Sequence, residues 1–400
     1  VTTPSLMTGM LPIAHTVHEY DDRQPAAATT MAEVFREAGY ATLSLSSISF
    51  TGKFTNLHQG FEELHESASL PDGHDLKTAR EYVDRLLPWL QAHRDVPFFV
   101  FLHVADPHDP FEARPPYAGI WADLTQRAKQ EERLEKVRPY IKEPTMKRFG
   151  MPTRAELVQA GIDADAYIAY ERDLYDGAIR GMDAEIGRLL DALRTLGLER
   201  ETLVVFSTDH GEEFLDHGKT FHGQSVYGEL SHAPLILRQP GVIPAGRVVE
   251  NTVASIHIMP TILELCRLPV PDAVQGSSML PLLFEHSGES WTDAPAYTEQ
   301  SADEPDDMES YAVVFDGWKL IHNTRRDDDR PEFELFDHAD DPLDQRNLAD
   351  EHPELVERLA ANLTAWRERA LAARLPSDAE TAESFDADEL ERLRNMGYME

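Results

Sequence analysis

The sequence predicts an α/β fold in which a mostly parallel central sheet is flanked by helices, with a small antiparallel sheet and a helix at the C-terminal end. Three observations predict it. Apolar β-runs alternate with amphipathic helical stretches, and this β–α–β order is typical of a parallel sheet. An apolar run at residues 96–105 is typical of a central strand. Three short β-runs separated by turn residues follow later, so we expect an α/β domain at residues 1–300 and an α+β subdomain at residues 301–400.

The first elements are marked by local signals. Thr30 and Glu33 form a capping-box pattern that starts a helix, Gly39 ends this helix, and a β-run follows at residues 41–46. Residues 78–93 are amphipathic and contain a proline, so we expect a kinked helix there.

A helical insertion is expected at about residues 112–165. Its stretch 126–142 is rich in charge, which is typical of a solvated helix, and we expect the insertion to shape the wall of a pocket. The longer helical pattern at residues 164–196 has apolar residues at core-packing spacing, so it is assigned no chemistry.

The second half of the chain completes both predicted domains. We expect strands at residues 203–206 and 234–237, β-runs of the small sheet at 311–315, 318–322 and 333–337, and a helix at 354–374. Loop-like stretches at residues 269–276 and 301–308 mark the domain boundary.

The charge balance restricts the partners of this protein. With 37 Lys and Arg against 72 Asp and Glu, the formal net charge is −35, which argues against nucleic acid and anionic membrane surfaces. A pocket for an anionic substrate must therefore supply its own cations.

The longest apolar run is too short to span a bilayer. Cys266 is the only cysteine, which excludes an internal disulfide and a cysteine-based metal site.

The strongest functional pattern follows the strand at residues 203–206. Asp209 and His210 stand side by side at its C-terminal end, where ligands bind in open α/β sheets. The next dozen residues contain three more cationic or proton-carrying groups: His217, Lys219 and His222. Aspartate and histidine are metal ligands, and lysine with histidine suits an anionic substrate whose charge grows in the transition state. The alternative is a turn cap and solvated loop residues, but five such groups together favour a functional site.

This pattern resembles the sulfatase family of the alkaline-phosphatase-like superfamily, in which a strand leads into Ser-Asp-His-Gly or Ser-Asp-Asn-Gly and then into a loop with His-Gly and Lys. The resemblance covers nearly the whole chain and implies an alkaline-phosphatase-like fold. It also implies that Asp209 and His210 bind one divalent metal ion. We expect Ca²⁺ or Mn²⁺ first, with Mg²⁺ or Zn²⁺ as alternatives, because oxygen ligands suit Ca²⁺ and Mg²⁺ whereas an imidazole nitrogen favours Mn²⁺ or Zn²⁺.

Two further segments resemble family motifs. Thr51-Gly52-Lys53 is similar to the family's Gly-Lys-Trp-His segment, which implies that Lys53 places a charge on the substrate oxyanion. Asp-Pro-His108-Asp-Pro is close to Asp-Pro-His-x-Pro, which implies that His108 donates a hydrogen bond to the transferring group. The alternatives are a solvated lysine and a histidine that stabilises its loop. His103, inside the strand, is expected to be a core residue.

The N-terminal residues resemble the family's nucleophile segment, Cys/Ser-x-Pro-x-Arg followed by a helix that ends in Thr-Gly. Aligned without gaps on Thr8 and Gly9, the nucleophile falls before Val1, so the chain is expected to be truncated and to lack the first strand with two further metal-binding aspartates. A gapped alignment makes Thr2 the nucleophile. Neither alignment gives the Cys-x-Pro-x-Arg pattern needed to form formylglycine. Residues 389–398 resemble a common family C-terminus, so truncation is expected at the N-terminus only.

The resemblance implies a metal-dependent hydrolase of sulfate esters with a hydroxyl-type nucleophile. Its substrate would be a small anionic ester, with sulfated carbohydrates included. Lys219, Lys53 and His108 would stabilise charge, and His217 or His222 would protonate the leaving group. The alternatives are a phosphonate monoester or phosphodiester hydrolase, a phospho-group transferase on the same scaffold, and a non-catalytic binder of sulfated glycans. The chain as given is expected to be inactive, and the sequence leaves compartment and oligomeric state open.

Overall fold

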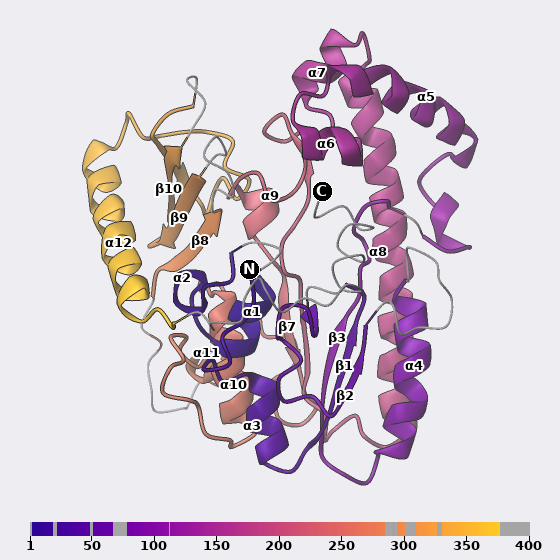
Figure 1. Cartoon of the computed structure of the whole chain (residues 1–400), viewed down its shortest axis with the longest axis vertical. Coiled ribbons are helices and arrows are strands. Elements are labelled where there is room, and N and C mark those ends of the chain that lie inside the picture. Colours follow the sequence, from indigo (N-terminus) through magenta and orange to yellow (C-terminus); the bar gives the residue numbers. More distant parts are fainter. Residues whose placement is uncertain are drawn as a thin grey trace.

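The computed structural model describes most of the chain, with gaps at both ends and in several loops. The described residues are 2–18, 22–48, 51–66, 78–111, 113–284, 291, 294–300, 309–325 and 330–376. Figure 1 shows the parallel sheet with two long helices on one side of the molecule and the antiparallel sheet with one long helix on the other. The stretches at residues 301–308 and 389–398, which carried predictions, lie outside the described residues.

A three-stranded parallel sheet is formed by strands within residues 41–103. Strand β1 (Ala41–Ser46) runs between β2 (Glu63–His65) and β3 (Phe98–His103) and is parallel to both. Helices α4 (Ala79–Ala92) and α8 (Ala164–Thr195) pack against each other and share an apolar core with these strands. This arrangement confirms the predicted α/β fold.

A second sheet, of two strands, leads into the loop that carries Asp209 and His210. Strand β4 (Val204–Ser207) pairs antiparallel with β7 (Leu235–Arg238). Within the described residues, β3 pairs only with β1, so the predicted central strand at residues 96–105 is an edge strand of its sheet. All six side chains of β3 are half-buried, because the strand faces a cavity of about 4190 Å³ that it lines together with β4.

The N-terminal helices pack on the far side of this cavity. They are α1 (Thr2–Thr8), α2 (Pro12–His15) and α3 (Met31–Glu37). Helix α1 contacts α2, α3, the 3-10 helix η6 (Ser255–His257) and α10 (Ile258–Leu265), and α11 (Leu280–Leu283) packs on α10. The buried side chains of Met7, Met259 and Leu263 belong to one apolar cluster there. The capping box predicted at Thr30 and Glu33 is confirmed at the start of α3.

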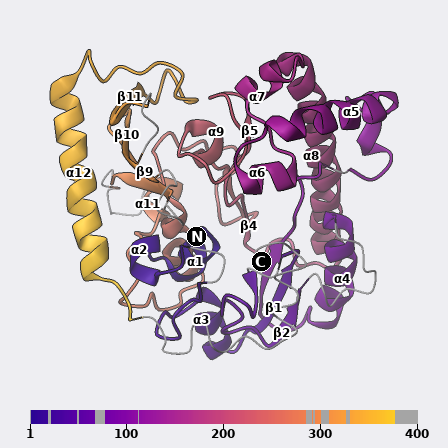
Figure 2. The same cartoon turned by 45° about the horizontal axis from the view of Figure 1, so that its top comes forward.

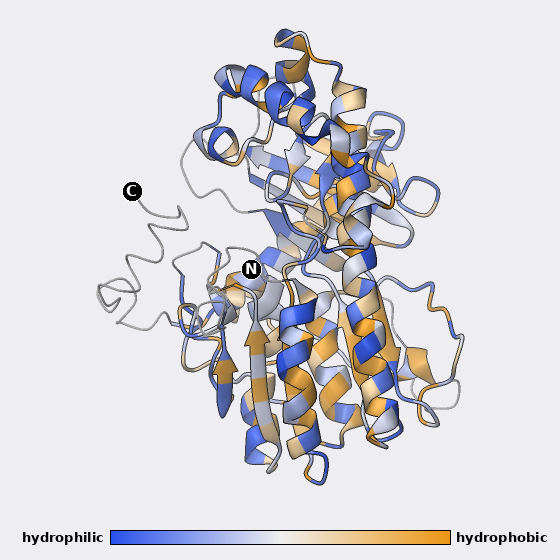
Figure 3. Ribbon diagram, turned by 90° about the vertical axis from the view of Figure 1, so that its right-hand side faces the viewer, coloured by the Kyte–Doolittle hydropathy of each residue, from blue (hydrophilic) through white to orange (hydrophobic). Residues whose placement is uncertain are grey.

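The insertion forms a helical cap at one end of the molecule, next to α8 (Figure 2). It contains the 3-10 helices η3 (Tyr117–Gly119), η4 (Leu124–Gln126) and η5 (Arg138–Tyr140), and the helices α5 (Arg127–Val137), α6 (Pro144–Phe149) and α7 (Arg154–Gln159). Only Gln130 and Val137 of α5 are buried, as expected for a solvated helix. Figure 3 shows hydrophobic residues gathered along the strands, while this cap carries many hydrophilic ones.

The C-terminal region is a four-stranded antiparallel sheet covered by a helix. Its strand order is β11 (Phe333–Asp337), β10 (Trp318–Arg325), β9 (Glu309–Phe315) and β8 (Ala296–Gln300), and α12 (Pro353–Ala372) packs on it. The three predicted β-runs and the helix are confirmed. Strand β8 was missed and lies inside residues 1–300, which had been assigned to the first domain.

Among the helices of the described residues, none is long and apolar enough to cross a membrane.

Candidate active site

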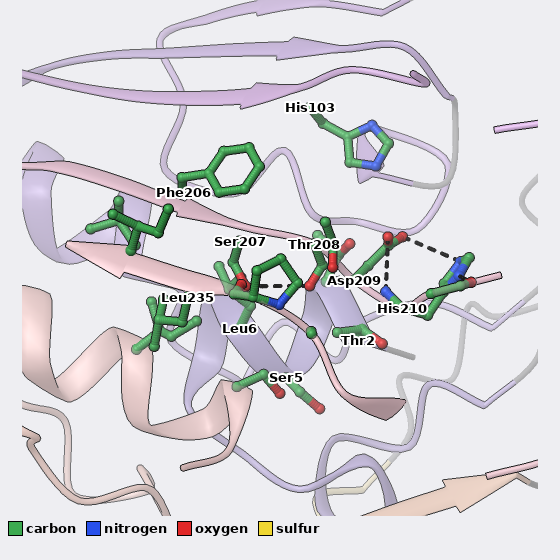
Figure 4. Close-up of a pocket in the computed structure, with 18 of the residues that line it drawn as sticks. Thr2, Ser5, Leu6, His103, Phe206, Ser207, Thr208, Asp209, His210 and Leu235 are labelled. Atoms are coloured by element: carbon green, nitrogen blue, oxygen red, sulfur yellow. Dashed lines mark hydrogen bonds and ion pairs between the residues drawn. The ribbon is translucent and has the colours of Figure 1, made fainter. Parts of the chain in front are cut away.

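Asp209 and His210 follow β4 directly and line the cavity (Figure 4). His210 donates from Nδ1 to the carbonyl oxygen of Gly211 at 2.8 Å, so Nε2 keeps its lone pair in the neutral ring. This Nε2 lies 3.7 Å from Oδ2 of Asp209. A carboxylate oxygen and an imidazole lone pair at this spacing fit two ligands of one cation. In the described parts of the chain, no group of three or more His, Cys, Asp or Glu residues is arranged to hold a metal ion.

The charge state of Asp209 suits a cation. Burial disfavours its carboxylate, but nearby His210 and His103 and backbone N–H donors outweigh burial and lower the pKa of Asp209. Burial lowers the pKa of His103, which lines the same cavity and contacts Ser47 Oγ from Nδ1 at 3.0 Å. His103 was expected to be a satisfied core residue; its ring is hydrogen-bonded to Ser47, and it also lies close enough to Asp209 for the two charges to influence each other.

Three predicted site histidines meet at one place. The His222 ring centroid lies 4.2 Å from that of His210 and 5.0 Å from that of His108. His108 donates from Nδ1 to the carbonyl oxygen of Asp109 at 2.7 Å. Burial, with His210 and His108 close by, lowers the pKa of His222 well below its ordinary value, so this ring is neutral at pH 7.

Glu212 orients His222, and the sequence analysis missed it. Its Oε1 lies 3.3 Å from Nδ1 of His222. The contact arises in the hairpin of β5 (Glu213–Phe214) and β6 (Thr220–Phe221), in which Glu213 pairs with Phe221. The residue before β5 therefore faces the residue after β6. Its position directly after Asp-His-Gly could have marked Glu212 as a candidate. Its contact with His222, however, depends on the register of the hairpin, which the sequence alone does not give.

The two lysines and Thr2 differ in their relation to the cavity. Lys219 lines the cavity, and its backbone N–H donates to Glu213 Oε1 at 2.8 Å. Thr2, in α1, also lines it (Figure 4). Lys53 is exposed and is not among the cavity-lining residues, and its backbone N–H donates to Glu66 at 2.8 Å. The structure thus brings Lys219 and Thr2 to the cavity of Asp209 but not Lys53.

His217 does not join the histidine cluster. Its Nδ1 lies 2.6 Å from Oε1 of Glu229, in α9 (Gly228–Ser231), and its Nε2 lies 2.8 Å from the carbonyl oxygen of Asp344. The ring stacks on Tyr227 with centroids 3.6 Å apart. Both ring nitrogens are thus occupied by protein atoms.

Comparison with known proteins identifies the family. The sulfatase family model matches residues 1–268, and a model of the C-terminal region of N-sulphoglucosamine sulphohydrolase matches residues 216–369. The chain therefore belongs to the sulfatase family.

Curated relatives are similar to about two thirds or more of this chain. An endo-4-O-sulfatase of Bacteroides thetaiotaomicron is 29% identical over 276 residues, which cover 66% of this chain and 50% of the relative. Arylsulfatase K of Gallus gallus is 28% identical, covering 71% and 54%. The multifunctional alkaline phosphatase superfamily protein PehA of Trinickia caryophylli is 29% identical, covering 72% and 58%. The chain thus spans about half the length of these relatives.

Solved structures share the fold. One neighbour, determined in complex with its substrate D-glucosamine-2-N,6-O-disulfate, has a TM-score of 0.69 at 19% identity and covers 95% of this chain and 89% of its own. The phosphonate monoester hydrolase of Agrobacterium radiobacter has a TM-score of 0.71 at 21% identity, with 92% and 86% covered. These similarities confirm the alkaline-phosphatase-like α/β fold.

Proposed function

We propose that the protein hydrolyses sulfate esters of small anionic substrates, using a divalent metal ion and a hydroxyl-type nucleophile. The observation that carries this proposal is the meeting of Asp209, His210, His222 and His108 at one cavity of a sulfatase-family fold. Relatives named as sulfatases support the reaction. The neighbour bound to D-glucosamine-2-N,6-O-disulfate supports a sulfated carbohydrate as substrate.

Asp209 and His210 would hold the metal ion. When bound, a divalent cation lowers the pKa of a hydroxyl nucleophile and polarises a nonbridging oxygen of the ester. The ionised carboxylate of Asp209 and the free lone pair on Nε2 of His210 fit this task. The nitrogen ligand favours Mn²⁺ or Zn²⁺, while the family resemblance keeps Ca²⁺ among the candidates.

His222 is the better candidate for the proton donor to the leaving group, because both ring nitrogens of His217 are occupied. His222 is neutral in the free site. The ring must gain a proton before it can act as the donor; an anionic ester beside it would favour that gain, whereas a divalent cation on the adjacent His210 would oppose it. Lys219 and His108 would stabilise the ester oxygens. Thr2 stays the candidate nucleophile among the described residues, and the role of Lys53 stays a prediction.

A second candidate is hydrolysis of phosphonate monoesters or phosphodiesters. It is favoured by the first nine residues, which offer threonine and serine hydroxyls but no cysteine. The similarity to PehA and to the phosphonate monoester hydrolase fold also supports it.

A side-by-side assay tests these proposals. The complete protein is stripped with a chelator, reloaded with Ca²⁺ or Mn²⁺, and given 4-nitrophenyl sulfate, 4-nitrophenyl phenylphosphonate and bis(4-nitrophenyl) phosphate. Faster metal-dependent turnover of the sulfate supports a sulfatase, and faster turnover of either phosphorus ester supports the second candidate. Binding of a sulfated sugar with no turnover of any ester would instead indicate a non-catalytic binder.

A further inference from the structure

Four aromatic rings stack in a column that runs from the metal-ligand candidate His210 into the helical insertion. The His210 and His222 centroids are 4.2 Å apart, the His222 and Phe221 centroids 3.9 Å, and the Phe221 and Phe149 centroids 5.8 Å. Successive planes are tilted by 32°, 27° and 20°. His108 meets Phe221 edge-on at 5.7 Å. The column thus connects His210 and His222, which are candidates for the chemistry, to Phe221 and Phe149, for which the family resemblance implies no role.

Phe221 is held in a backbone conformation that is uncommon for a bulky residue. Its φ is 79°, in the left-handed region. Such strain persists only where the surroundings fix it, and it is concentrated at functional sites. The surroundings here come from the insertion, because Thr220 Oγ1 donates to Pro152 O at 3.0 Å and the Arg154 N–H donates to Gly218 O at 2.8 Å.

The outer end of the column is apolar and faces the cavity. Phe149 and Phe221 are half-buried and line the same cavity as His108 and His222. Two methionines of the same region, Met146 and Met151, line it as well. Polar groups border this apolar patch, because Gln224 donates to Met146 Sδ at 3.1 Å and the Arg148 guanidinium carbon lies 5.8 Å from the Phe149 ring centroid. A ring that also carries hydroxyl or charged groups could therefore meet both an aromatic surface and hydrogen-bonding side chains.

We propose that Phe149, at the outer end of the column, forms with the edge of Phe221 a leaving-group subsite that binds a ring on the alcohol side of the ester. The inference rests on the proposed function, in which the ester group lies at His108 and His222. The leaving group then extends past His222 along the column. The chemistry recognised is an apolar ring face, which a pyranose presents through its C–H bonds and an aryl group through its π-face.

The test compares Phe149→Leu and Phe149→Ala with Tyr140→Ala in the complete protein. Leucine keeps apolar volume but removes the ring. Tyr140 lies in the same insertion, is 38% exposed and does not line the cavity, so its replacement is the matched control. The probes are a 6-sulfated pyranose, 4-nitrophenyl sulfate and an acyclic alkyl sulfate, and kcat and KM are measured for each.

We expect both Phe149 variants to lose about three- to tenfold in kcat/KM on ring substrates, mainly through KM, and to keep their rate on the acyclic ester. Loss on the pyranose alone or on the aryl ester alone identifies which ring the subsite takes. Equal loss on all three esters, or no loss on any, would overturn the inference, because Phe149 would then act only by supporting His222 or not at all.

Failure of the proposed function is distinguishable from failure of the subsite. If the unmodified protein turns over no sulfate ester, the proposed function fails and the same comparison is made by calorimetric binding. Weaker binding of ring sulfates to Phe149→Leu than to Tyr140→Ala then supports the subsite. Equal binding by the two variants, or no binding of any ring sulfate, overturns it.

Discussion

The imidazole of His217 donates from Nδ1 to Glu229 Oε1 across 2.6 Å, at a contact in which the Glu229 carboxylate is nearly buried. Its Nε2 donates to the carbonyl oxygen of Asp344 at 2.8 Å. A carbonyl oxygen only accepts, and a carboxylate beside the other nitrogen favours a proton there as well, so these two contacts favour the doubly protonated ring and raise the pKa of His217. This charged ring fastens the loop between β5 and β6 to the C-terminal region.

Replacing His217 by Asn should destabilise the protein more at low pH than at high pH. Burial opposes the charged ring, but the contacts with Glu229 and Asp344 and the charge of Glu213 outweigh it and raise the pKa of His217 above its ordinary value of 6.5. Protonation therefore stabilises the fold, fully below about pH 6.5, and this contribution is lost as pH rises through the higher folded-state pKa. Cations close to this contact include Lys319, which pairs with Asp344, and Arg330, whose guanidinium carbon lies 5.1 Å from the centroid of the Tyr227 ring.

The measurement is urea unfolding of the unmodified protein and His217→Asn at pH 6 and pH 9. The stability difference between the two proteins should shrink at pH 9. A difference of the same size at both values would mean that His217 contributes through packing on Tyr227 and not through its charge.

Lys319 and Asp344 form the most buried ion pair among the described residues. Nζ lies 2.5 Å from Oδ2, and the side chains are 1% and 0% exposed. Replacing Lys319 by Met should cost about 3–5 kcal/mol of unfolding free energy, because it leaves the Asp344 charge buried and unpaired. Adding Asp344→Asn to the same chain should recover part of this loss.

The matched control for Lys319 is Arg194→Met. Arg194 pairs with Asp191 at 2.8 Å on the surface, where both side chains are about two-thirds exposed. An exposed pair contributes about 0–1 kcal/mol. Urea unfolding of the three variants checks the contrast, and similar losses for Lys319→Met and Arg194→Met would contradict the structural role given to the buried pair.

Asp109 should destabilise the fold at neutral and alkaline pH. Burial, with Glu171 and Glu212 nearby, raises the pKa of Asp109 from 3.8 to about 7. The native state therefore binds more protons than the unfolded state between about pH 4 and pH 7, and the Asp109 contribution to stability falls across this window. Asp109→Asn should match the unmodified protein near pH 4 and exceed its stability at pH 8.

Denaturant midpoints at these two pH values test the Asp109 prediction. Asp183→Asn, on the exposed face of α8, serves as the control for removal of one negative charge from this acidic protein. Equal gains from Asp109→Asn and Asp183→Asn at pH 8 would mean that general charge repulsion, and not burial of Asp109, sets the effect.

Local signals predicted the elements well, and contacts between distant segments were missed. The capping box at Thr30 and the strand before Asp209 depend on neighbouring residues, so the sequence carries them directly. The His217 contact with Asp344 joins residues 127 positions apart, and no periodicity encodes it. Strand β8 was missed because its sequence, Ala-Tyr-Thr-Glu-Gln, has no apolar alternation, and all five residues are half-buried.

The candidate site divides in the same way. Asp209 and His210 are adjacent in sequence, and the β-strand before them fixes where they lie. Glu212 and Phe221 gain their roles only through the register of the β5–β6 hairpin. Phe149 gains its role through the packing of the insertion against this hairpin, and no local sequence pattern predicts that packing. Motif reasoning thus predicts the polar groups that do chemistry better than the apolar groups that surround them.

Asp209→Asn should abolish metal-dependent turnover and weaken metal binding even when no substrate is present. Asparagine keeps the shape of the side chain but removes the charge that holds a cation next to Nε2 of His210. Titration of the chelator-stripped protein with Mn²⁺ or Ca²⁺, followed by thermal unfolding, reads binding directly, because a ligand that binds only the native state raises Tm. The unmodified protein and Asp183→Asn should both show the rise, and Asp209→Asn should show little or none. If Asp209→Asn showed the full rise, the metal would lie elsewhere, and loss of turnover alone would then have to come from a different role of this carboxylate.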